Sequence, residues 1–296
     1  CTRNGDRYLA EQLNSIVSPA GWKCQIYASD DASTDSTTDV LEAFASAGAY
    51  PLSLRAGPCR GAAANFLSLI CDAAIPGDVF AYCDQDDLWS SDKLTRAINA
   101  LSPLDRDTPA LYCGRTRTVD EHGRSVGLSP AFRRAPSFAN ALIHNIGGGN
   151  TMVMNTSARN LLLQAGVVDV VAHDWWTYLL VAGAGGTVIY DDEPALHYRQ
   201  HGGNEVGANT GLQAGIRRYK KALGGTNREW NSRNIAALNS CRALLTKENR
   251  ALLDDFASMR GSGLARRLLT LRRAGFYAQT TKGNIGLVLA TLLKKL

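Results

Sequence analysis

The sequence predicts an α/β protein in which a mostly parallel sheet is flanked by helices and followed by a basic helical region. Up to about residue 115, short apolar runs bounded by turn residues alternate with segments of helical spacing. From about residue 212 onward the pattern is helical throughout. Charge changes near the same place: residues 1–210 carry a net charge of −8 and residues 211–296 carry +13, which gives the +5 of the chain. We therefore expect one domain over 1–210 and a basic helical region over 211–296.

Composition bounds the class of protein. The 296 residues suffice for one large domain with an appendage, and 45% hydrophobic with 20% charged residues is ordinary for a soluble globular protein. No secretory signal is visible, and no apolar run reaches the ~18 residues needed to span a bilayer. The seven cysteines are scattered without a CxxC pair, which predicts reduced thiols in a cytoplasmic protein. The chain begins at Cys1 directly before a loop-like segment, so we expect a strand to precede it.

The elements up to residue 115 follow from apolar spacing and capping residues. Residues 8–17 have helical apolar spacing, and Ser36 and Asp39 are spaced like a capping box. Ser91 stands where the N-cap of a later helix is expected. The expected order is helix 8–17, strand 23–29, a helix within 30–46, strand 51–57, helix 61–74, buried strand 78–84, helix 91–101 and strand 109–114.

Beyond residue 115 the alternation of strands and helices becomes looser. Residues 118–126 have the pattern of a hairpin, and the last strand before the boundary is expected at 187–192. No internal repeat or low-complexity tract is visible. Between these two segments we expect a helix at 137–145, a strand at 151–155, and helices at 156–166 and 174–185.

Polar clusters follow three of the predicted strands. They are SDDASTD after 23–29, GPCRG after 52–55 and CDQDD after 78–82. In open α/β sheets, ligands bind in the crevice outside the carboxyl ends of the strands. The three clusters therefore predict one composite binding site.

Asp84 and Asp86 are two residues apart, so in an extended segment their carboxylates project to the same side. Paired hard oxygens facing a cleft suit Mg²⁺ or Mn²⁺, especially when a phosphate supplies further ligands. An acidic turn in solvent, capping the helix at Ser91, is the alternative, since acidic turns are common. From the residues alone, both interpretations stay open.

Asp30 and Asp31 follow another strand and have two interpretations of the same kind. They fit a helix entry, where aspartate is favoured, and they fit hydrogen bonds to a base or ribose. In the segment 59–66, Arg60 and small residues precede a helix, which favours an anion such as a phosphate. Small residues there also let a helix pack closely on a sheet.

The remaining candidates lie in three later segments. His173 and Asp174 begin a helix ahead of two tryptophans, where an aspartate fits either an N-cap or a general base beside a stackable sugar. Arg199 and His201 lie on a loop that could fold over a diphosphate. The three glycines in 145–153 fit a tight turn or a close backbone approach to a ligand.

Taken in order, seven segments resemble the family 2 inverting glycosyltransferases with the GT-A fold, and the rhamnosyltransferase-like branch that builds bacterial cell-surface polysaccharides. The segments are CTRNGDRYLAEQLNSI, SDDASTD, GAAANF, CDQDDLW, GNTMV, HDWW and YRQHGGN. The resemblance covers residues 1–207, and the ordered combination is much more specific than any single segment.

This resemblance implies roles for individual residues. Asp30 maps onto the aspartate that contacts the nucleobase, and Asp84 and Asp86 onto the DxD motif that holds Mg²⁺ or Mn²⁺ against the diphosphate. Asp174 maps onto the general base. His201 resembles a loop histidine that completes metal coordination in some relatives. The further nucleotide-sugar contacts it implies are Thr2, Asn4, Asp31, Arg60, Asn65, Gln85 and Arg199. The acceptor contacts it implies are Gly149, Asn150, Trp175 and Trp176.

The chain departs from the family pattern at one position of the site. Histidine stands at position 173, where relatives often have glutamate before the base. Asp87 resembles the acidic residue that commonly follows the DxD motif.

The resemblance implies an inverting transfer of a sugar from a nucleotide-sugar to a hydroxyl of a cell-surface glycan or lipid-linked saccharide, as in O-antigen synthesis. It favours dTDP-L-rhamnose as donor, but the motifs fit UDP-sugars equally well. A sugar nucleotidyltransferase also uses paired aspartates, although the loop after the first strand fits it poorly. A non-catalytic nucleotide-sugar binder is a third interpretation.

The basic C-terminal region mixes Leu, Ile and Ala with Arg and Lys on predicted helices. Packing of a solvated helical region on the acidic domain is one interpretation. Peripheral attachment to the anionic inner face of the cytoplasmic membrane is another. Nucleic-acid binding is not expected, because aromatic residues are sparse there and no recognition motif is visible.

Overall fold

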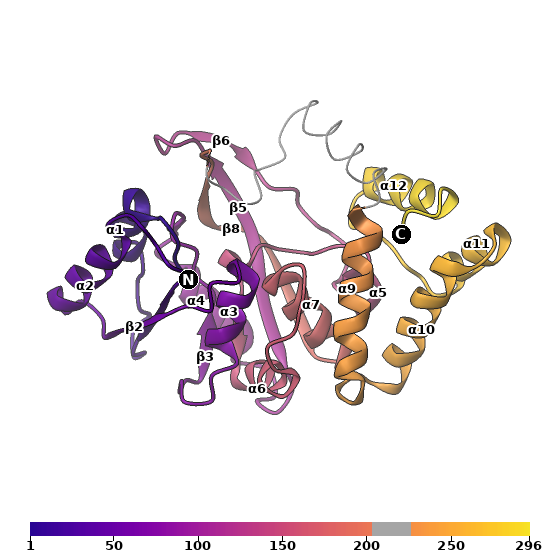
Figure 1. Ribbon diagram of the computed structural model, residues 1–296, viewed down its shortest axis with the longest axis horizontal. Helices are drawn as coiled ribbons and strands as arrows, with labels where there is room; N and C mark the ends of the chain where they lie inside the picture. The colour runs from indigo at the N-terminus through magenta and orange to yellow at the C-terminus, as the bar shows by residue number, and fades with distance from the viewer. Residues whose placement is uncertain (203–225) are drawn as a thin grey trace.

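The computed structural model describes residues 1–202 and 226–296. In this part of the chain a central sheet carries helices along its sides, and further helices extend from one end (Figure 1). The strands are β1 (Ile26–Asp30), β2 (Leu52–Ala56), β3 (Val79–Ala81), β4 (Leu88–Trp89), β5 (Ala110–Val119), β6 (Ser125–Leu128), β7 (Val153–Asn155) and β8 (Thr187–Arg199).

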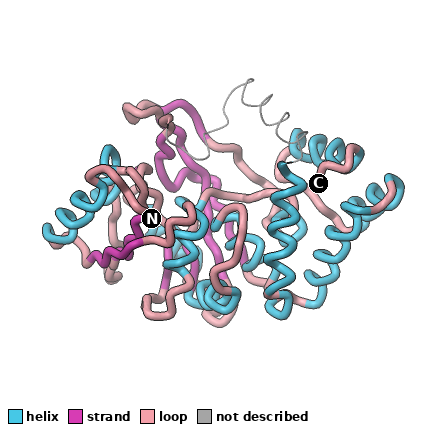
Figure 2. Tube along the Cα trace, viewed as in Figure 1, coloured by secondary structure: helices cyan, strands magenta, loops and turns pink. Residues whose placement is uncertain are grey.

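Helices account for the other elements (Figure 2). The α-helices are α1 (Asp6–Asn14), α2 (Thr37–Ala47), α3 (Ala62–Ile70), α4 (Lys93–Leu101), α5 (Phe138–Ala141), α6 (Thr156–Ala165), α7 (His173–Gly183), α9 (Thr226–Ser240), α10 (Lys247–Gly261), α11 (Leu264–Arg273) and α12 (Thr281–Leu292). Two short 3₁₀ helices cover Gly149–Thr151 and Arg242–Leu244. None of the described helices is both long and apolar enough to cross a bilayer.

The described strands form two sheets, a parallel pair β1–β2 and a mixed six-stranded sheet in the order β3-β7-β5-β8-β4 with β6 beside β5, so the prediction of a mostly parallel sheet is wrong. β1 pairs with β2 in parallel and β5 pairs with β8 in parallel, but the other described pairings, β3–β7, β7–β5, β5–β6 and β8–β4, are antiparallel. β3 and β5 do run in the same direction, as the alternating pattern predicts. However, β7 lies between them and runs the opposite way. The sequence pattern predicts the strand itself but not its place between β3 and β5, because β7 follows an irregular segment and is not part of the regular alternation of strands and helices.

The first residues of the chain join the two sheets. Thr2 forms a parallel bridge with Asp30, its N–H donates to the carbonyl of Ser29 at 3.0 Å, and its own carbonyl accepts from the N–H of Asp31 at 2.9 Å. On the other side, the amino group of Cys1 donates to the carbonyl of Cys83 at 3.2 Å. The segments that follow β1 and β3 are therefore held side by side.

Three local expectations are wrong in detail. Ser36 makes no side-chain cap bond to α2; the Oδ1 of Asp35 accepts from the N–H of Thr37 instead, at 3.0 Å. Asp92, rather than Ser91, is the N-cap of α4. The strand β3 was expected to be buried, but Val79 and Phe80 are half-buried and Ala81 is exposed.

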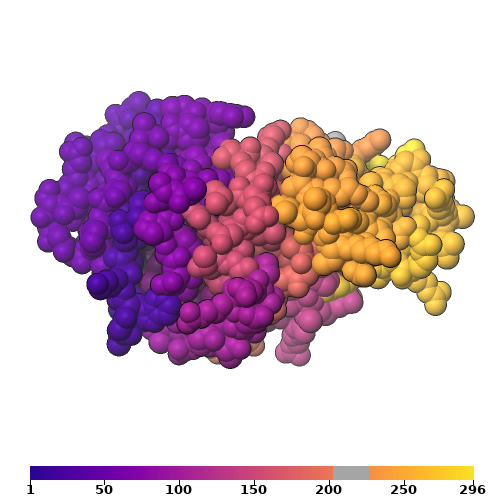
Figure 3. All heavy atoms as spheres, turned by 90° about the horizontal axis from the view of Figure 1, so that it is seen from below, coloured from indigo at the N-terminus to yellow at the C-terminus, as the bar shows by residue number. Residues whose placement is uncertain are grey.

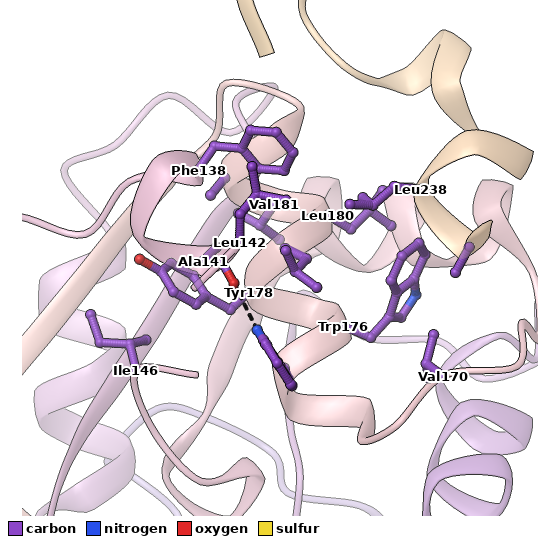
Figure 4. Packing of buried hydrophobic residues seen from close by; sticks show 14 of the residues in the cluster. Phe138, Ala141, Leu142, Ile146, Val170, Trp176, Tyr178, Leu180, Val181 and Leu238 are labelled. Carbon is purple, nitrogen blue, oxygen red and sulfur yellow. Dashed lines mark hydrogen bonds between the residues drawn. The ribbon is translucent and has the colours of Figure 1, made fainter. Parts of the chain in front are cut away.

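The C-terminal helices share their hydrophobic core with α5 and α7. Figure 4 shows Leu238 of α9 beside Leu180, with Trp176 and Val170 nearby, and these side chains belong to one buried cluster. Polar bonds add to this contact, because the N–H of Thr246 donates to the carbonyl of Gly183 at 3.1 Å. The predicted boundary at residue 210 lies outside the described residues, and the division into two domains stays a prediction.

We expect Leu238→Ala to lower the free energy of unfolding by about 2–5 kcal/mol, because a side chain with no exposed surface leaves a cavity there. Urea unfolding measures this change. Val167→Ala is the control, since Val167 is 55% exposed and should change stability by less than about 0.5 kcal/mol. If Leu238→Ala destabilised only a second unfolding transition at higher urea concentration, the shared core would be contradicted.

Candidate active site

A cavity of about 320 Å³ lies at the carboxyl ends of β1 and β2. Its lining residues are Asp30, Ala32, Thr38, Leu54, Arg55, Ala56, Gly57 and Cys59. The parallel pairing of the two strands brings their final residues, Asp30 and Ala56, together. The sequence prediction that polar clusters meet at this edge is confirmed for these two strands.

Asp30 is nearly buried, and its carboxylate orders the loop after β1. Its Oδ1 accepts from the hydroxyls of Thr2 at 2.8 Å and Ser33 at 2.6 Å, and its Oδ2 accepts from the N–H of Ser33 at 2.8 Å. Thr2 therefore braces Asp30 from the N-terminal segment. Asn4, with a positive φ of 48°, accepts through Oδ1 from the N–H of Thr34 at 2.8 Å.

Asp31 is buried and holds the loop between β2 and α3. Its Oδ1 accepts from the N–H of Cys59 at 2.5 Å and its Oδ2 from the N–H of Gly61 at 3.0 Å. Asn65 is also buried, and its amide donates to the carbonyl of Ser29 at 3.0 Å. Arg60, between the two anchored amides, is exposed directly before α3.

Gln85 ties residues 82–87 between β3 and β4, which we call the acidic loop, to the N-terminal segment. Its Oε1 accepts from the N–H of Arg3 at 2.8 Å, and its Nε2 donates to the carbonyl of the same residue at 3.0 Å. The predicted nucleotide-sugar residues near Thr2, Asp30 and Gln85 thus belong to one connected region.

The acidic loop after β3 gathers negative charge in a poorly solvated place. Burial and the carboxylate of Asp86 raise the pKa of Asp84 to about 7. The Oδ2 of Asp86 lies 2.8 Å from the Nε2 of His201, so the predicted metal residues Asp86 and His201 are in contact. A divalent cation would relieve the repulsion that raises this pKa.

Asp87 has no exposed surface, and it is the residue that fixes the acidic loop. Its Oδ1 accepts from the N–H of Arg199 at 3.0 Å, and its Oδ2 accepts from the amide of Asn150. Burial, followed by the charges of Asp84 and Asp86, raises the pKa of Asp87 well above its ordinary value. The predicted acceptor residue Asn150 thus supports the acidic loop directly.

Arg199 is nearly buried, beneath the acidic loop. Its Nε donates to the carbonyl of Asp86 at 3.1 Å, its NH1 to the carbonyl of Glu121 at 3.2 Å, and its NH2 to the carboxylate of Glu11 at 2.6 Å. A contact between Arg199 and a diphosphate, as predicted, would require these bonds to be exchanged. The arrangement favours a role for Arg199 in shaping the loop.

Asp174 begins α7, and two backbone amides orient its carboxylate. The N–H of Gly149 donates to Oδ2 at 3.0 Å and the N–H of Trp175 donates to Oδ1 at 2.6 Å. Burial raises the pKa of Asp174, although these hydrogen bonds oppose the rise. The charge of Asp174 also contributes to the raised pKa of Asp84, after burial and Asp86, so the two carboxylates influence each other.

His173 packs under this segment as a neutral ring. It stacks on Phe66 with 3.9 Å between ring centroids, and burial lowers its pKa to about 3. A Cβ on Gly149 would lie 2.4 Å from the Nε2 of His173, so only glycine allows this approach. His173, which departs from the family pattern, therefore fixes the position of Gly149, the residue whose N–H binds Asp174.

Comparisons with known proteins identify the family. The sequence profile described as "Glycosyl transferase family 2" matches residues 1–162. The dTDP-rhamnosyl transferase RfbG of Shigella flexneri is 30% identical over 268 residues, which cover 86% of this chain and 84% of that protein.

The chain belongs to glycosyl transferase family 2. It is a glycosyltransferase that transfers a sugar from a nucleotide-sugar, and this membership decides against the nucleotidyltransferase and the non-catalytic binder. An uncharacterized glycosyltransferase of Rickettsia typhi is a more distant relative, 24% identical over 67% of this chain and 61% of that protein.

Two solved structures show that this family 2 enzyme has the GT-A fold. The mannosyltransferase PcManGT of Pyrobaculum calidifontis, in complex with GDP-Man and Mn²⁺, covers 99% of this chain and 83% of its own, with a TM-score of 0.51 and 18% identity. S. aureus TarS 1–349, in complex with UDP-GlcNAc, covers 93% of this chain and 90% of its own, with a TM-score of 0.53 and 15% identity.

The acidic loop of the glycosyltransferase offers an incomplete set of metal ligands. Within residues 1–202 and 226–296, no three His, Cys, Asp or Glu side chains are placed to hold a metal ion by themselves. Asp84 and Asp86 nevertheless supply the hard oxygens that Mg²⁺ and Mn²⁺ prefer, and their mutual repulsion fits a cation between them. Phosphate oxygens and water would have to supply the remaining ligands.

Both tryptophans predicted to contact the acceptor are buried. The prediction that Trp176 contacts the acceptor is therefore wrong, because its side chain has no exposed surface. Trp176 has no exposed surface and lies in the core (Figure 4), because nearly every side of α7 is covered by protein. Trp175 is 8% exposed, and its Nε1 donates to the carbonyl of Ala141 at 2.7 Å. Tryptophans next to an acidic residue suggest a stacking platform, but here they fill the core.

Sequence reasoning missed Lys93. This lysine has no exposed surface; its Nζ donates to the carbonyl of Asn150 at 2.6 Å and lies 3.2 Å from the ring centroid of Trp89. Burial lowers its pKa to about 7, against the effect of Cys83, Asp87 and Asp84. The spacing gave a signal, because Lys93, Ala97 and Leu101 form one buried stripe of α4.

We expect Gly149→Ala to lower both the free energy of unfolding, by about 1–3 kcal/mol, and the transfer rate, because the added methyl group collides with His173 and moves Asp174. Gly127→Ala is the matched control, since a Cβ there meets nothing within 4 Å. Urea unfolding in the parent and in His173→Ala tests the cause. An equal cost in both backgrounds would rule out the collision.

Proposed function

We propose that this family 2 enzyme transfers L-rhamnose from dTDP-L-rhamnose, with inversion, to a hydroxyl of a cell-surface glycan or a lipid-linked saccharide. The observation that carries the proposal is the placement of Asp174, oriented by two amides, where its charge influences the pKa of Asp84. The similarity to a dTDP-rhamnosyl transferase over most of both chains supports rhamnose as the sugar.

A UDP-sugar is the second candidate donor. The TarS structure with UDP-GlcNAc supports it only through the shared fold, whereas RfbG is 30% identical in sequence. We therefore favour the deoxythymidine nucleotide.

In the proposed complex, the donor lies between the β1–β2 cavity and the acidic loop. The nucleobase occupies the cavity beside Asp30, and the diphosphate extends towards the start of α3, where amides and the exposed Arg60 favour an anion. Asp84 and Asp86, with His201, would hold Mg²⁺ or Mn²⁺ at the diphosphate. The ion, when bound, neutralises charge that develops on the leaving group.

The proposed reaction is a single displacement at the anomeric carbon. Asp174 accepts the proton of the acceptor hydroxyl, the oxygen forms its bond to the anomeric carbon, and the bond from that carbon to the diphosphate breaks. Attack from the face opposite the nucleotide inverts the configuration. The raised pKa of Asp174 supports this role, since a carboxylate that binds protons more readily is a better base.

The acceptor side of the proposal centres on the segment before β7. Gly149 binds Asp174 and Asn150 binds the acidic loop, so we place the acceptor hydroxyl beside this backbone. A lipid-linked acceptor would place the reaction on the cytoplasmic side of the membrane. The protein itself would then be a cytoplasmic enzyme of polysaccharide synthesis such as that of O-antigen.

We expect Asp174→Asn to reduce kcat by about 10²–10⁴-fold while the Kd for dTDP changes little, because the amide keeps its shape but loses its basicity. In the parent, kcat/KM should fall as pH decreases through a pKa above the ordinary aspartate value, since the base must be ionised. Asp169→Asn is the control, because the Asp169 side chain is 75% exposed. Full activity of Asp174→Asn would remove Asp174 from this role.

Donor choice and metal dependence are tested together. We expect release of dTDP from dTDP-L-rhamnose in the presence of a lipid-linked acceptor, loss of activity with EDTA, and recovery with Mn²⁺ or Mg²⁺. Nucleoside diphosphate and glycosylated product are measured for a panel of dTDP-, UDP- and GDP-sugars. Faster transfer from a UDP-sugar would overturn the donor assignment, and full activity in EDTA would overturn the metal site.

A further inference from the structure

The last two helices expose an unusual amount of apolar surface. Among the described residues, 13 large apolar side chains are strongly exposed, and eight of them lie on α11 and α12 or at the end of α12. We call this set the α11–α12 apolar face. Its members are Leu264, Leu268, Leu269, Ile285, Val288, Leu289, Leu292 and Leu293.

The spacing on α12 shows that these side chains form one stripe. Ile285, Val288, Leu289, Leu292 and Leu293 follow the i, i+3, i+4, i+7, i+8 pattern that places residues on one face of a helix. The opposite side of α12 packs on the protein through the buried residues Leu287 and Thr291. The exposed stripe is therefore separate from the side of α12 that packs against the rest of the protein.

On α11 three leucines are exposed, but they do not form a single stripe: Leu264 and Leu268 lie one turn apart, and Leu269 points to another side of the helix. Leu264, Leu268 and Leu269 are exposed, with Leu269 the most exposed at 68%, whereas Thr270 and Leu271 are buried. The two helices contact one another, so their exposed apolar side chains belong to one region of the molecule. Contiguous exposed apolar surface of this kind marks an interaction site.

The charge of the same region is entirely positive. Residues 264–296 contain seven Lys and Arg and no Asp or Glu. Arg267 is buried and the exposed Arg273 pairs with Asp255 at 2.6 Å, and four further basic side chains are exposed. They are Arg266, Arg272, Lys282 and Lys294.

We propose that the α11–α12 apolar face docks on an anionic lipid surface. Apolar side chains between exposed basic residues match the two layers of such a surface: the stripe enters the boundary of the acyl chains, and the cations contact lipid phosphates. A second copy of this chain fits less well, because two such faces would bring like charges together.

The position of the face is compatible with catalysis. α11 and α12 lie at the opposite end of the molecule from α1, α2 and β2, where the β1–β2 cavity is found (Figures 1 and 3). Docking therefore leaves the predicted donor site open. The proposal depends on the proposed function only in one respect, that a docked enzyme would meet lipid-linked acceptors.

Co-sedimentation of the full chain with vesicles tests the docking. One set of vesicles contains phosphatidylcholine alone, and the other contains phosphatidylcholine mixed with phosphatidylglycerol. We expect binding to the mixed vesicles at low salt and release at high salt, because exposed charges are screened. The variant Leu269→Ser/Ile285→Ser should bind at least about tenfold more weakly if burial of the apolar stripe contributes to binding.

Two controls make the result decisive. Val126→Ser/Leu128→Ser removes two exposed apolar side chains, 54% and 41% exposed, from β6 and should bind like the parent. Circular dichroism and urea unfolding verify that each variant folds. No binding to the mixed vesicles at low salt, or equal binding by both double variants, would overturn the proposal.

Two further readouts separate the alternatives. Light scattering reports self-association, and a dimer that only the α11–α12 variant loses, without vesicle binding, would assign the face to a second copy and overturn lipid docking. Transfer to a water-soluble acceptor should be unchanged in Leu269→Ser/Ile285→Ser. If the parent binds vesicles but transfers no sugar, the proposed function fails while the docking stands.

Discussion

The burial of the Asp87 carboxylate is the constraint on which the geometry of the site depends. A buried carboxylate is tolerated only when its oxygens are hydrogen-bonded, and Asp87 obtains these bonds from the amide of Asn150 and the N–H of Arg199. The acidic loop, the segment before β7 and the end of β8 must therefore meet at one point. Lys93 secures the same point from α4, through the carbonyl of Asn150.

The contact between Asn150 and Asp87 also links the acidic loop to Asp174. Asn150 binds the acidic loop, and its neighbour Gly149 donates to Asp174, so one short stretch of backbone sets both positions. His173 supports this stretch from below because its ring is neutral and stacked on Phe66. The carboxylate of Asp174 and the acidic loop that carries Asp84 are thus positioned by adjacent residues, Gly149 and Asn150.

Much of the fold could be predicted from the sequence, because apolar spacing and turn residues are local signals. The motif segments were found for the same reason, and Asp30, Asp84 and Asp174 lie in the region where the polar clusters were expected to meet. The direction of β7 could not be predicted, since strand pairing depends on distant partners. Trp176 and Arg199 also show this limit: both types suit ligand binding, and only packing reveals that one fills the core and the other lies beneath a loop.

Helix α7 links two parts of the molecule, because it carries Asp174 at one end and contacts the C-terminal helices at the other. Its last residue, Gly183, accepts from Thr246 and from the amide of Asn249, at the beginning of α10. At 1.5 Å per residue, this helix is about 16 Å long. Asp174 and the start of α10 are therefore attached to opposite ends of one helix, so the C-terminal helices help to fix the position of the candidate base.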